Sequence, residues 1–111
     1  MSKREPNLLI KDIIDSGDKI LIYTEGMSFE TFQSDSKTID AVIRNFEIIG
    51  EAANRLPENF KENYPDIDWF KIRGFRNRIV HDYMGIDFEI VWLIREQFLP
   101  ELIKKLRTIQ R

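Results

Sequence analysis

The sequence contains no cysteine and a single histidine, and these two scarcities limit its chemistry. Without cysteine the chain can form no disulfide, no thiolate nucleophile and no cysteine-ligated zinc site. The absence of cysteine also fits a reducing cytosol, so we expect a cytoplasmic protein. Any histidine-dependent chemistry in one copy of the chain must depend on His81.

Long apolar runs and a strong net charge are missing as well. No stretch approaches the roughly 18 consecutive apolar residues of a membrane span. The start, MSKREPNLL, lacks the apolar core of a signal peptide, so we expect neither a span nor a signal. The net charge of −2 gives no general reason to expect binding to nucleic acid or membranes. A site for a polyanion would therefore have to be local.

Helical periodicity is the main pattern that is present. Apolar residues recur at helical spacing over about 7–23, 36–56 and 88–109, with shorter pieces at 28–33 and 57–65. A further helix is expected over 69–83, begun by Asp68 and ended by a left-handed Gly85. Strand-like alternation is essentially absent. The sequence therefore predicts an all-α, single-domain bundle of four to five helices over residues 1–111.

Single residues refine this outline. Ser28 and Asp87 are expected to cap the helices that follow them. Gly17 lowers helix propensity by about 1 kcal/mol against alanine, which indicates close approach of a neighbouring helix. Pro100 is expected to kink or divide the last helix.

Four formal positive charges and no carboxylate fall within residues 71–81, and they are carried by Lys71, Arg73, Arg76 and Arg78. Two interpretations remain open. The cations could occupy a solvated helix face near its C-terminus, where the helix dipole stabilises them. Alternatively, part of the run could form a local phosphate site. We expect Lys71, Arg73 and Arg78 to face solvent, and Arg73 is the best placed of the three for a substrate contact.

Helix geometry bears on this choice. Five residues on an ideal helix correspond to a rotation of about 140°, so His81 would point away from Arg76. Arg76 and Tyr83 would share one stripe, and Arg73 would lie about 60° from Arg76, within reach of a common substrate. The three residues Arg76, His81 and Tyr83 converge only if the helix loosens near Gly85 or two copies face each other.

The single histidine favours a dimer for any metal-free RNA cleavage. Such a reaction needs a general base at the 2′-hydroxyl, a proton donor for the leaving oxygen and a cation at the phosphate. A symmetric homodimer would bring two copies of His81 and Arg76 to one cleft. If the chain is an enzyme, we expect it to be one only as a dimer.

The order Arg76, four residues, His81, one residue, Tyr83 resembles the R-x4-6-H-x-Y signature of the HEPN superfamily. Three longer segments are similar to its HepT-like toxin branch: FEIIGEAANRLP at 46–57, IRGFRNRIVHDYMGID at 72–87 and VWLIREQFLPEL at 91–102. The resemblance therefore covers nearly the whole chain.

The resemblance implies a helical, metal-independent ribonuclease toxin that works as a homodimer without a cofactor. Arg76 would stabilise the scissile phosphate, His81 would act as general acid or base, and Asn77 would orient the phosphate. The implied partner is a nucleotidyltransferase antitoxin that transfers AMP onto Tyr83. The added anion would repel an RNA backbone.

Plainer interpretations stay open for each residue. Arg76 could pair with Glu47 or Glu51, His81 could be a histidine stabilised at a helix end, and Tyr83 could belong to the core. The chain could also be a non-catalytic helical module that binds a nucleotidyltransferase or a nucleotide without cutting RNA, or a purely structural dimer. We expect no metal site, because the Glu-x-x-His pairs of di-iron bundles are missing.

Overall fold

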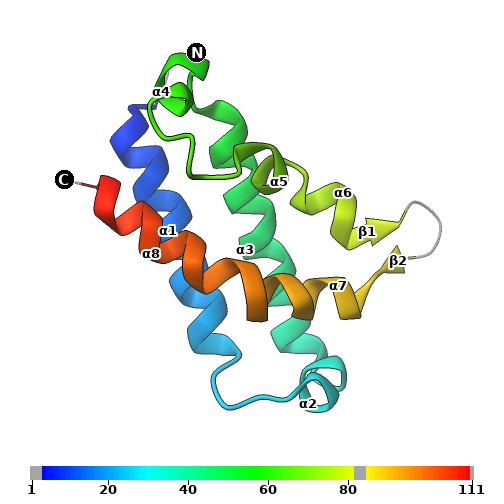
Figure 1. Ribbon diagram of the computed structural model, residues 1–111. Helices are drawn as coiled ribbons and strands as arrows, with labels where there is room; N and C mark the ends of the chain where they lie inside the picture. Colours follow the sequence, from blue (N-terminus) through cyan, green and yellow to red (C-terminus); the bar gives the residue numbers. More distant parts are fainter. Residues whose placement is uncertain (1–3, 82–84, 111) are drawn as a thin grey trace.

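The computed structural model describes residues 4–81 and 85–110 and is almost entirely helical (Figure 1). In chain order the elements are α1 (Pro6–Tyr23), α2 (Phe29–Gln33), α3 (Ser36–Arg55), α4 (Glu58–Glu62), α5 (Trp69–Arg73), α6 (Phe75–Ile79), β1 (Val80–His81), β2 (Gly85–Ile86), α7 (Phe88–Leu93), the π-helix η1 (Ile94–Phe98) and α8 (Leu99–Ile109). The all-α, single-domain prediction is confirmed. Helical pieces in the described residues outnumber the four to five expected, because two predicted helices are divided.

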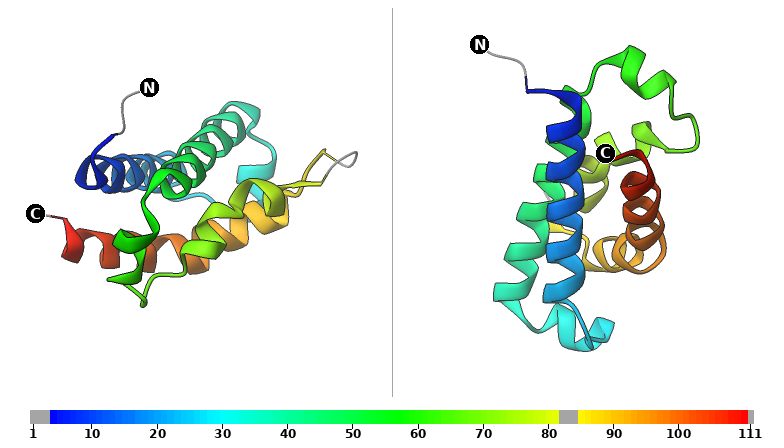
Figure 2. Two further views of the ribbon diagram at one scale, coloured as in Figure 1. Left: turned by 90° about the horizontal axis from the view of Figure 1, so that it is seen from above. Right: turned by 90° about the vertical axis from the view of Figure 1, so that its left-hand side faces the viewer.

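Two layers enclose one hydrophobic core. The long helices α1 and α3 run antiparallel, side by side, in the first layer (Figures 1 and 2). The second layer contains α5, α6 and the C-terminal rod of α7, η1 and α8, which pack on the first. Apolar stripes of both layers meet between them, and fully buried members include Ile10, Ile13, Ile20, Val42, Phe46, Ile49, Phe75 and Leu99.

The three capping predictions are confirmed. Ser28 forms a reciprocal capping box with Thr31, since its Oγ accepts from the Thr31 N–H at 3.2 Å and Thr31 Oγ1 accepts from the Ser28 N–H at 2.9 Å. The Asp68 carboxylate accepts from the N–H of Lys71 at 3.0 Å, and that of Asp87 accepts from the N–H of Ile90 at 3.1 Å. These caps begin α2, α5 and α7 at the places that the sequence indicates.

Close approach at Gly17 is also confirmed. A Cβ atom at this position would lie 2.7 Å from Cδ1 of Ile103, so α8 crosses α1 where α1 has no side chain. The prediction that Pro100 divides the last helix holds as well. Because Pro100 has no N–H, it cannot donate to a carbonyl one turn earlier, and the turn before it widens into η1.

One side chain of η1 fixes the rod to the end of α1. Nε of Arg95 donates to Oγ1 of Thr24 at 2.7 Å, and that buried hydroxyl donates to the Ile20 carbonyl, also at 2.7 Å. The hydroxyl therefore links a cation of the second layer to the Ile20 carbonyl near the C-terminus of α1, which also accepts from the Thr24 N–H at 3.1 Å.

The prediction of one continuous helix over 69–83 is wrong. The chain bends at Gly74, helix α6 ends at Ile79, and β1 pairs with β2 in a two-residue antiparallel ladder, Val80 with Ile86 and His81 with Gly85. The Ile79 carbonyl accepts from the Asp87 N–H at 2.8 Å. Gly85 is left-handed, with φ of 83°, but it stands in this hairpin and does not end a helix.

Phe75 anchors α6 between the layers. Its side chain is fully buried and meets two aromatic rings edge-on, Phe46 of α3 at 5.3 Å and Phe98 of η1 at 5.6 Å between centroids. Such T-shaped pairs contribute about 0.5 to 1.5 kcal/mol beyond the burial of area. The three rings thus join α3, α6 and η1.

We expect Phe75→Ala to lower the free energy of unfolding by about 3 to 5 kcal/mol, because it leaves a cavity between three elements. Urea denaturation followed by circular dichroism measures the loss. The control is Phe70→Ala, whose side chain is 85% exposed and whose effect should stay within about 0.5 kcal/mol. Equal losses in the two variants would contradict this role of Phe75.

Candidate functional site

The segment that carries the predicted site residues runs along α5, the bend at Gly74, α6 and β1. One of its faces is buried through Trp69, Ile72, Phe75 and Ile79. Nε1 of Trp69 also donates to the Tyr64 carbonyl at 3.2 Å, which holds the start of the segment. The backbone of Arg76 directly follows the buried Phe75, so packing of that ring fixes the position of the Arg76 backbone.

The side chains of Arg76 and His81, and the whole of Tyr83, lie outside the described residues. The backbone nevertheless corrects one expectation. Arg76 stands in α6 and His81 in β1, so the chain changes from helix to strand between them. The 140° separation of an ideal helix therefore does not apply to this pair, and their catalytic roles stay predictions.

Asn77 and Arg73 are brought together, as their spacing suggests. Both side chains are exposed, and both line a shallow surface pocket of about 220 Å³ with Asn54 of α3, Phe70 and Gly74. Among the residues that the structure describes, no carboxylate lines this pocket, which we call the α5–α6 pocket. The arrangement suits an anion, and phosphate binding by Arg73 and Asn77 stays a prediction.

The other two cations of the segment differ from each other. Arg78 is exposed, as expected. Lys71 is half-buried, and its Nζ lies 5.1 Å from the ring centroid of Phe98. The prediction of a solvent-facing Lys71 is therefore wrong in part, because a cation–π contact draws the ammonium toward the rod.

Sequence reasoning missed two residues of the pocket, Asn54 and Phe70. A signal for Phe70 did exist. It follows Trp69 directly and lies off the buried stripe at 69, 72, 75 and 79, so helical periodicity places its ring toward solvent. Asn54 comes from a distant part of the sequence, and no local pattern points to it.

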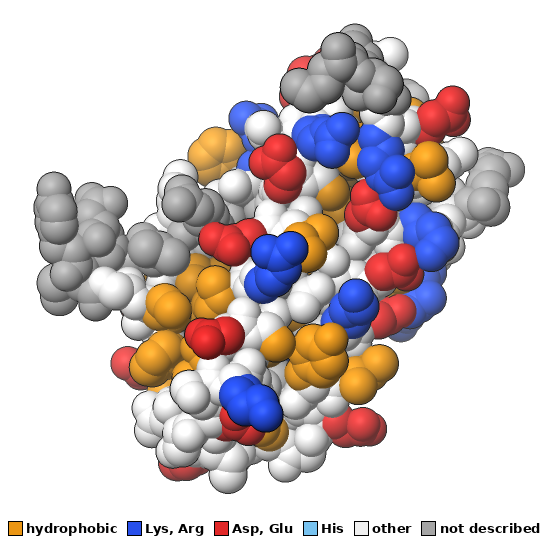
Figure 3. Space-filling model, turned by 180° about the vertical axis from the view of Figure 1, so that it is seen from behind, with side chains coloured by type: hydrophobic (Ala, Val, Ile, Leu, Met, Phe, Trp, Pro, Cys, Tyr) orange, Lys and Arg blue, Asp and Glu red, His pale blue; other side chains and the backbone are white. Residues whose placement is uncertain are grey.

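A larger groove of about 360 Å³ lies between α1 and α3, and its charged lining consists of Asp12, Arg44, Glu47, Glu51 and Arg55. Three carboxylates against two guanidinium groups make this groove a poor site for a polyanion. The face of α1 and α3 shows the same mixture of charges (Figure 3).

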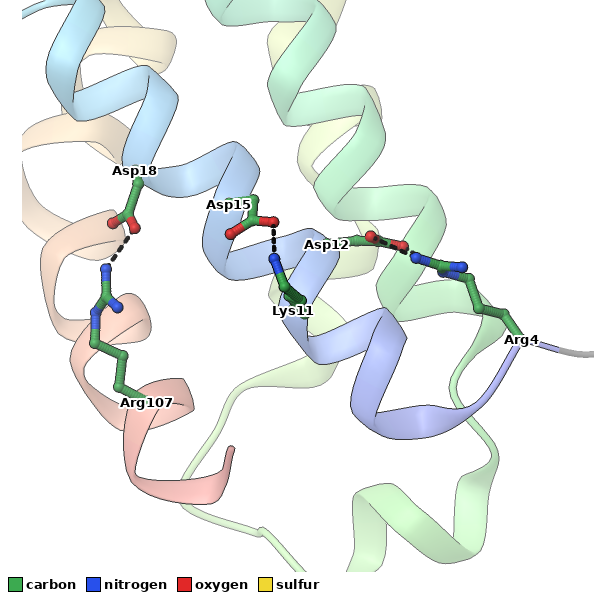
Figure 4. A network of polar contacts seen from close by, with 6 residues as sticks. All are labelled: Arg4, Lys11, Asp12, Asp15, Asp18 and Arg107. Carbon is green, nitrogen blue, oxygen red and sulfur yellow. Dashed lines mark hydrogen bonds and ion pairs between the residues drawn. The ribbon is translucent and has the colours of Figure 1, made fainter. Parts of the chain in front are cut away.

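Ion pairs along α1 account for part of that mixture (Figure 4). Asp12 accepts from Nε of Arg4 at 2.7 Å, and Asp15 accepts from Nζ of Lys11 at 2.8 Å. Each of these hydrogen bonds raises the pKa of its cation. Asp18 pairs with Arg107 of α8. The carboxylates at positions 12 and 15 are thus each matched by a neighbouring cation.

No three histidine, aspartate or glutamate side chains among residues 4–81 and 85–110 gather as ligands of a metal ion. None of the described helices combines the length and the apolar character that crossing a bilayer requires.

Comparison with known proteins gives a consistent picture. Residues 13–109 match the sequence model of the family described as Ribonuclease HepT-like. The chain is 38% identical over 109 residues to "Putative RNase MJ0127" of Methanocaldococcus jannaschii, covering 98% of this chain and 90% of the relative. It is 34% identical over 109 residues to "Probable ribonuclease HepT" of Thermococcus cleftensis, covering 98% and 99%. No solved structure matches the chain significantly. The chain belongs to the HepT-like ribonuclease family.

Proposed function

We propose that this chain is a metal-independent endoribonuclease that acts as the toxin of a toxin–antitoxin pair in the cytoplasm. Membership of the HepT-like family, together with the R-x4-H-x-Y pattern on residues 76–83, carries the proposal. The local charge supports it, because residues 69–81 include no carboxylate in a chain whose net charge is −2. An RNA backbone is attracted to such a segment even when the whole protein is not basic.

The chemistry assigns one role to each residue. His81 takes the proton of the 2′-hydroxyl, the 2′-oxygen bonds to the adjacent phosphorus, and the bond from phosphorus to the 5′-oxygen breaks. The leaving 5′-oxygen needs a proton, which the His81 of a second copy supplies. Arg76 stabilises the charge that develops on the phosphate oxygens. Because each chain has one histidine and this reaction uses two, the proposed active form is a homodimer.

The change of backbone between Arg76 and His81 is compatible with this scheme. On a continuous helix the two residues would diverge by about 140°. Because α6 ends at Ile79 and the chain turns into β1, that constraint is removed. Arg73 and Asn77 of the α5–α6 pocket lie on the same segment and extend the phosphate contacts.

Control of the toxin is assigned to Tyr83. A nucleotidyltransferase antitoxin joins the Tyr83 oxygen to the α-phosphorus of ATP, and pyrophosphate leaves. The tyrosine, two residues from His81 in the sequence, then carries an anion. Repulsion between this anion and an RNA backbone blocks cleavage.

The second candidate function is a partner module that binds a nucleotidyltransferase or a nucleotide and cuts no RNA. The near-neutral total charge favours it, because general ribonucleases gain affinity from a positive surface. Cleavage assays separate the two candidates.

We expect the EDTA-treated protein to cleave single-stranded RNA and His81→Ala to be slower by about 10² to 10⁴, the contribution of a general acid or base. Gel analysis of a labelled RNA measures the rates. The matched control is Arg78→Gln, which removes an exposed cation of the same segment and should change the rate only a few-fold. A His81→Ala variant as active as the wild type would exclude the ribonuclease mechanism.

Tyr83→Phe should keep its ribonuclease activity and lose adenylation. We expect intact-mass spectrometry to find AMP on the wild type, but not on this variant, after incubation with ATP and a purified nucleotidyltransferase antitoxin. Tyr23→Phe, which removes a 42% exposed tyrosine of α1, is the control and should still be modified. Modification that survives Tyr83→Phe would place the acceptor elsewhere.

A further inference from the structure

Phe70 exposes 85% of its surface, more than any other large hydrophobic residue in the described part of the chain. Its neighbours on the buried stripe, Ile72 and Phe75, are fully buried. A single exposed apolar residue is common and needs no explanation by itself. The surroundings of this ring are what distinguish it.

Phe70 is the single apolar side chain among the described residues that line the α5–α6 pocket, and its neighbours there are polar. Phe70 and Arg73 of α5 and Asn77 of α6 are all exposed, and they line this pocket from both sides of the bend at Gly74. Asn54 reaches the pocket from α3, and Gly74 adds only backbone. The described lining of the pocket thus combines an aromatic ring, a guanidinium and two amides, with no carboxylate among them.

This set of groups matches an unpaired nucleotide. An aromatic face stacks on any base, a guanidinium binds a phosphate, and amides hydrogen-bond to base edges. A protein partner that buried Phe70 as an anchor would be expected to meet further apolar residues around the ring. The α1–α3 groove, with three carboxylates, lacks this complementarity to a polyanion.

We propose that Phe70 is a stacking platform for an unpaired base of the RNA substrate, with Arg73 on the neighbouring phosphate. The proposal rests on the proposed ribonuclease function and specifies the substrate of the same site. Asn77 directly follows Arg76, so the stacked nucleotide lies next to the scissile phosphate along the segment. Because a base inside a duplex already stacks on both faces, the platform selects single strands.

The test measures binding of a fluorescent, unstructured RNA oligonucleotide in which every 2′-hydroxyl is methylated, so that it cannot be cleaved. We expect Phe70→Ala to weaken affinity by about 5- to 150-fold, the usual loss of one base–aromatic stack. Phe70→Tyr and Phe70→Trp should retain wild-type affinity within a few-fold. The matched control is Leu93→Ala, which truncates a 45% exposed side chain of α7 and should not change affinity.

Two further readouts exclude a merely structural role. The same oligonucleotide annealed to its complement should bind weakly and with no dependence on Phe70. Sedimentation velocity should give one oligomeric state for the wild type and Phe70→Ala. Unchanged affinity in Phe70→Ala would overturn the proposal. So would a loss of affinity that accompanies a change of oligomeric state, because Phe70 would then belong to an interface between copies.

Failure of this inference differs from failure of the proposed function. If the wild type cleaves unmethylated RNA but Phe70→Ala binds normally, the stacking platform is wrong and the ribonuclease stands. If binding depends on Phe70 but the wild type cleaves no RNA, the stacking proposal is supported and the proposed ribonuclease function is wrong. A wild type that neither binds nor cleaves RNA would overturn both.

Discussion

The edge-on packing of Phe75 between Phe46 and Phe98 is the contact on which the candidate site depends. These rings join α3, α6 and η1, which come from three separate parts of the sequence. Arg76 immediately follows the central ring, so the core determines where the motif begins. Burial of these aromatic rings therefore holds in place the backbone that carries the polar residues of the candidate site.

The distribution of charge separates two faces of the molecule. Along α1, aspartates are matched by nearby cations, and the groove beside α3 mixes both signs (Figures 3 and 4). Along α5 and α6, cations occur without any carboxylate over residues 69–81. A chain with a net charge of −2 can therefore present a local surface for RNA, while its other face carries balanced charge.

Features that depend on local chemistry could be predicted from the sequence alone. The long helices α1 and α3, the caps at Ser28, Asp68 and Asp87, and the close approach at Gly17 follow from apolar spacing, capping chemistry and the absence of a side chain. The division before Pro100 follows from its missing N–H.

Features that depend on tertiary contacts were missed. The hairpin after Ile79 is closed by the N–H of Asp87, eight residues further along, and Asn54 enters the α5–α6 pocket from another helix. Periodicity in one segment carries no signal for either. The roles of Arg76, His81 and Tyr83 came from the resemblance to a family, since a lone histidine and a basic run have ordinary structural explanations.

The central claim is that two copies of the chain form one catalytic cleft, and subunit mixing tests it most directly. Arg76→Gln and His81→Ala would be co-expressed with different tags, isolated as the mixed dimer and assayed for RNA cleavage in EDTA. A shared cleft predicts that the mixed dimer, which retains one Arg76 and one His81, cleaves RNA faster than either homodimer, because one homodimer has no Arg76 and the other has no His81. It should remain slower than the wild type, whose two copies of His81 supply both the base and the acid. Failure to isolate a mixed dimer, or full activity in either homodimer, would contradict the account.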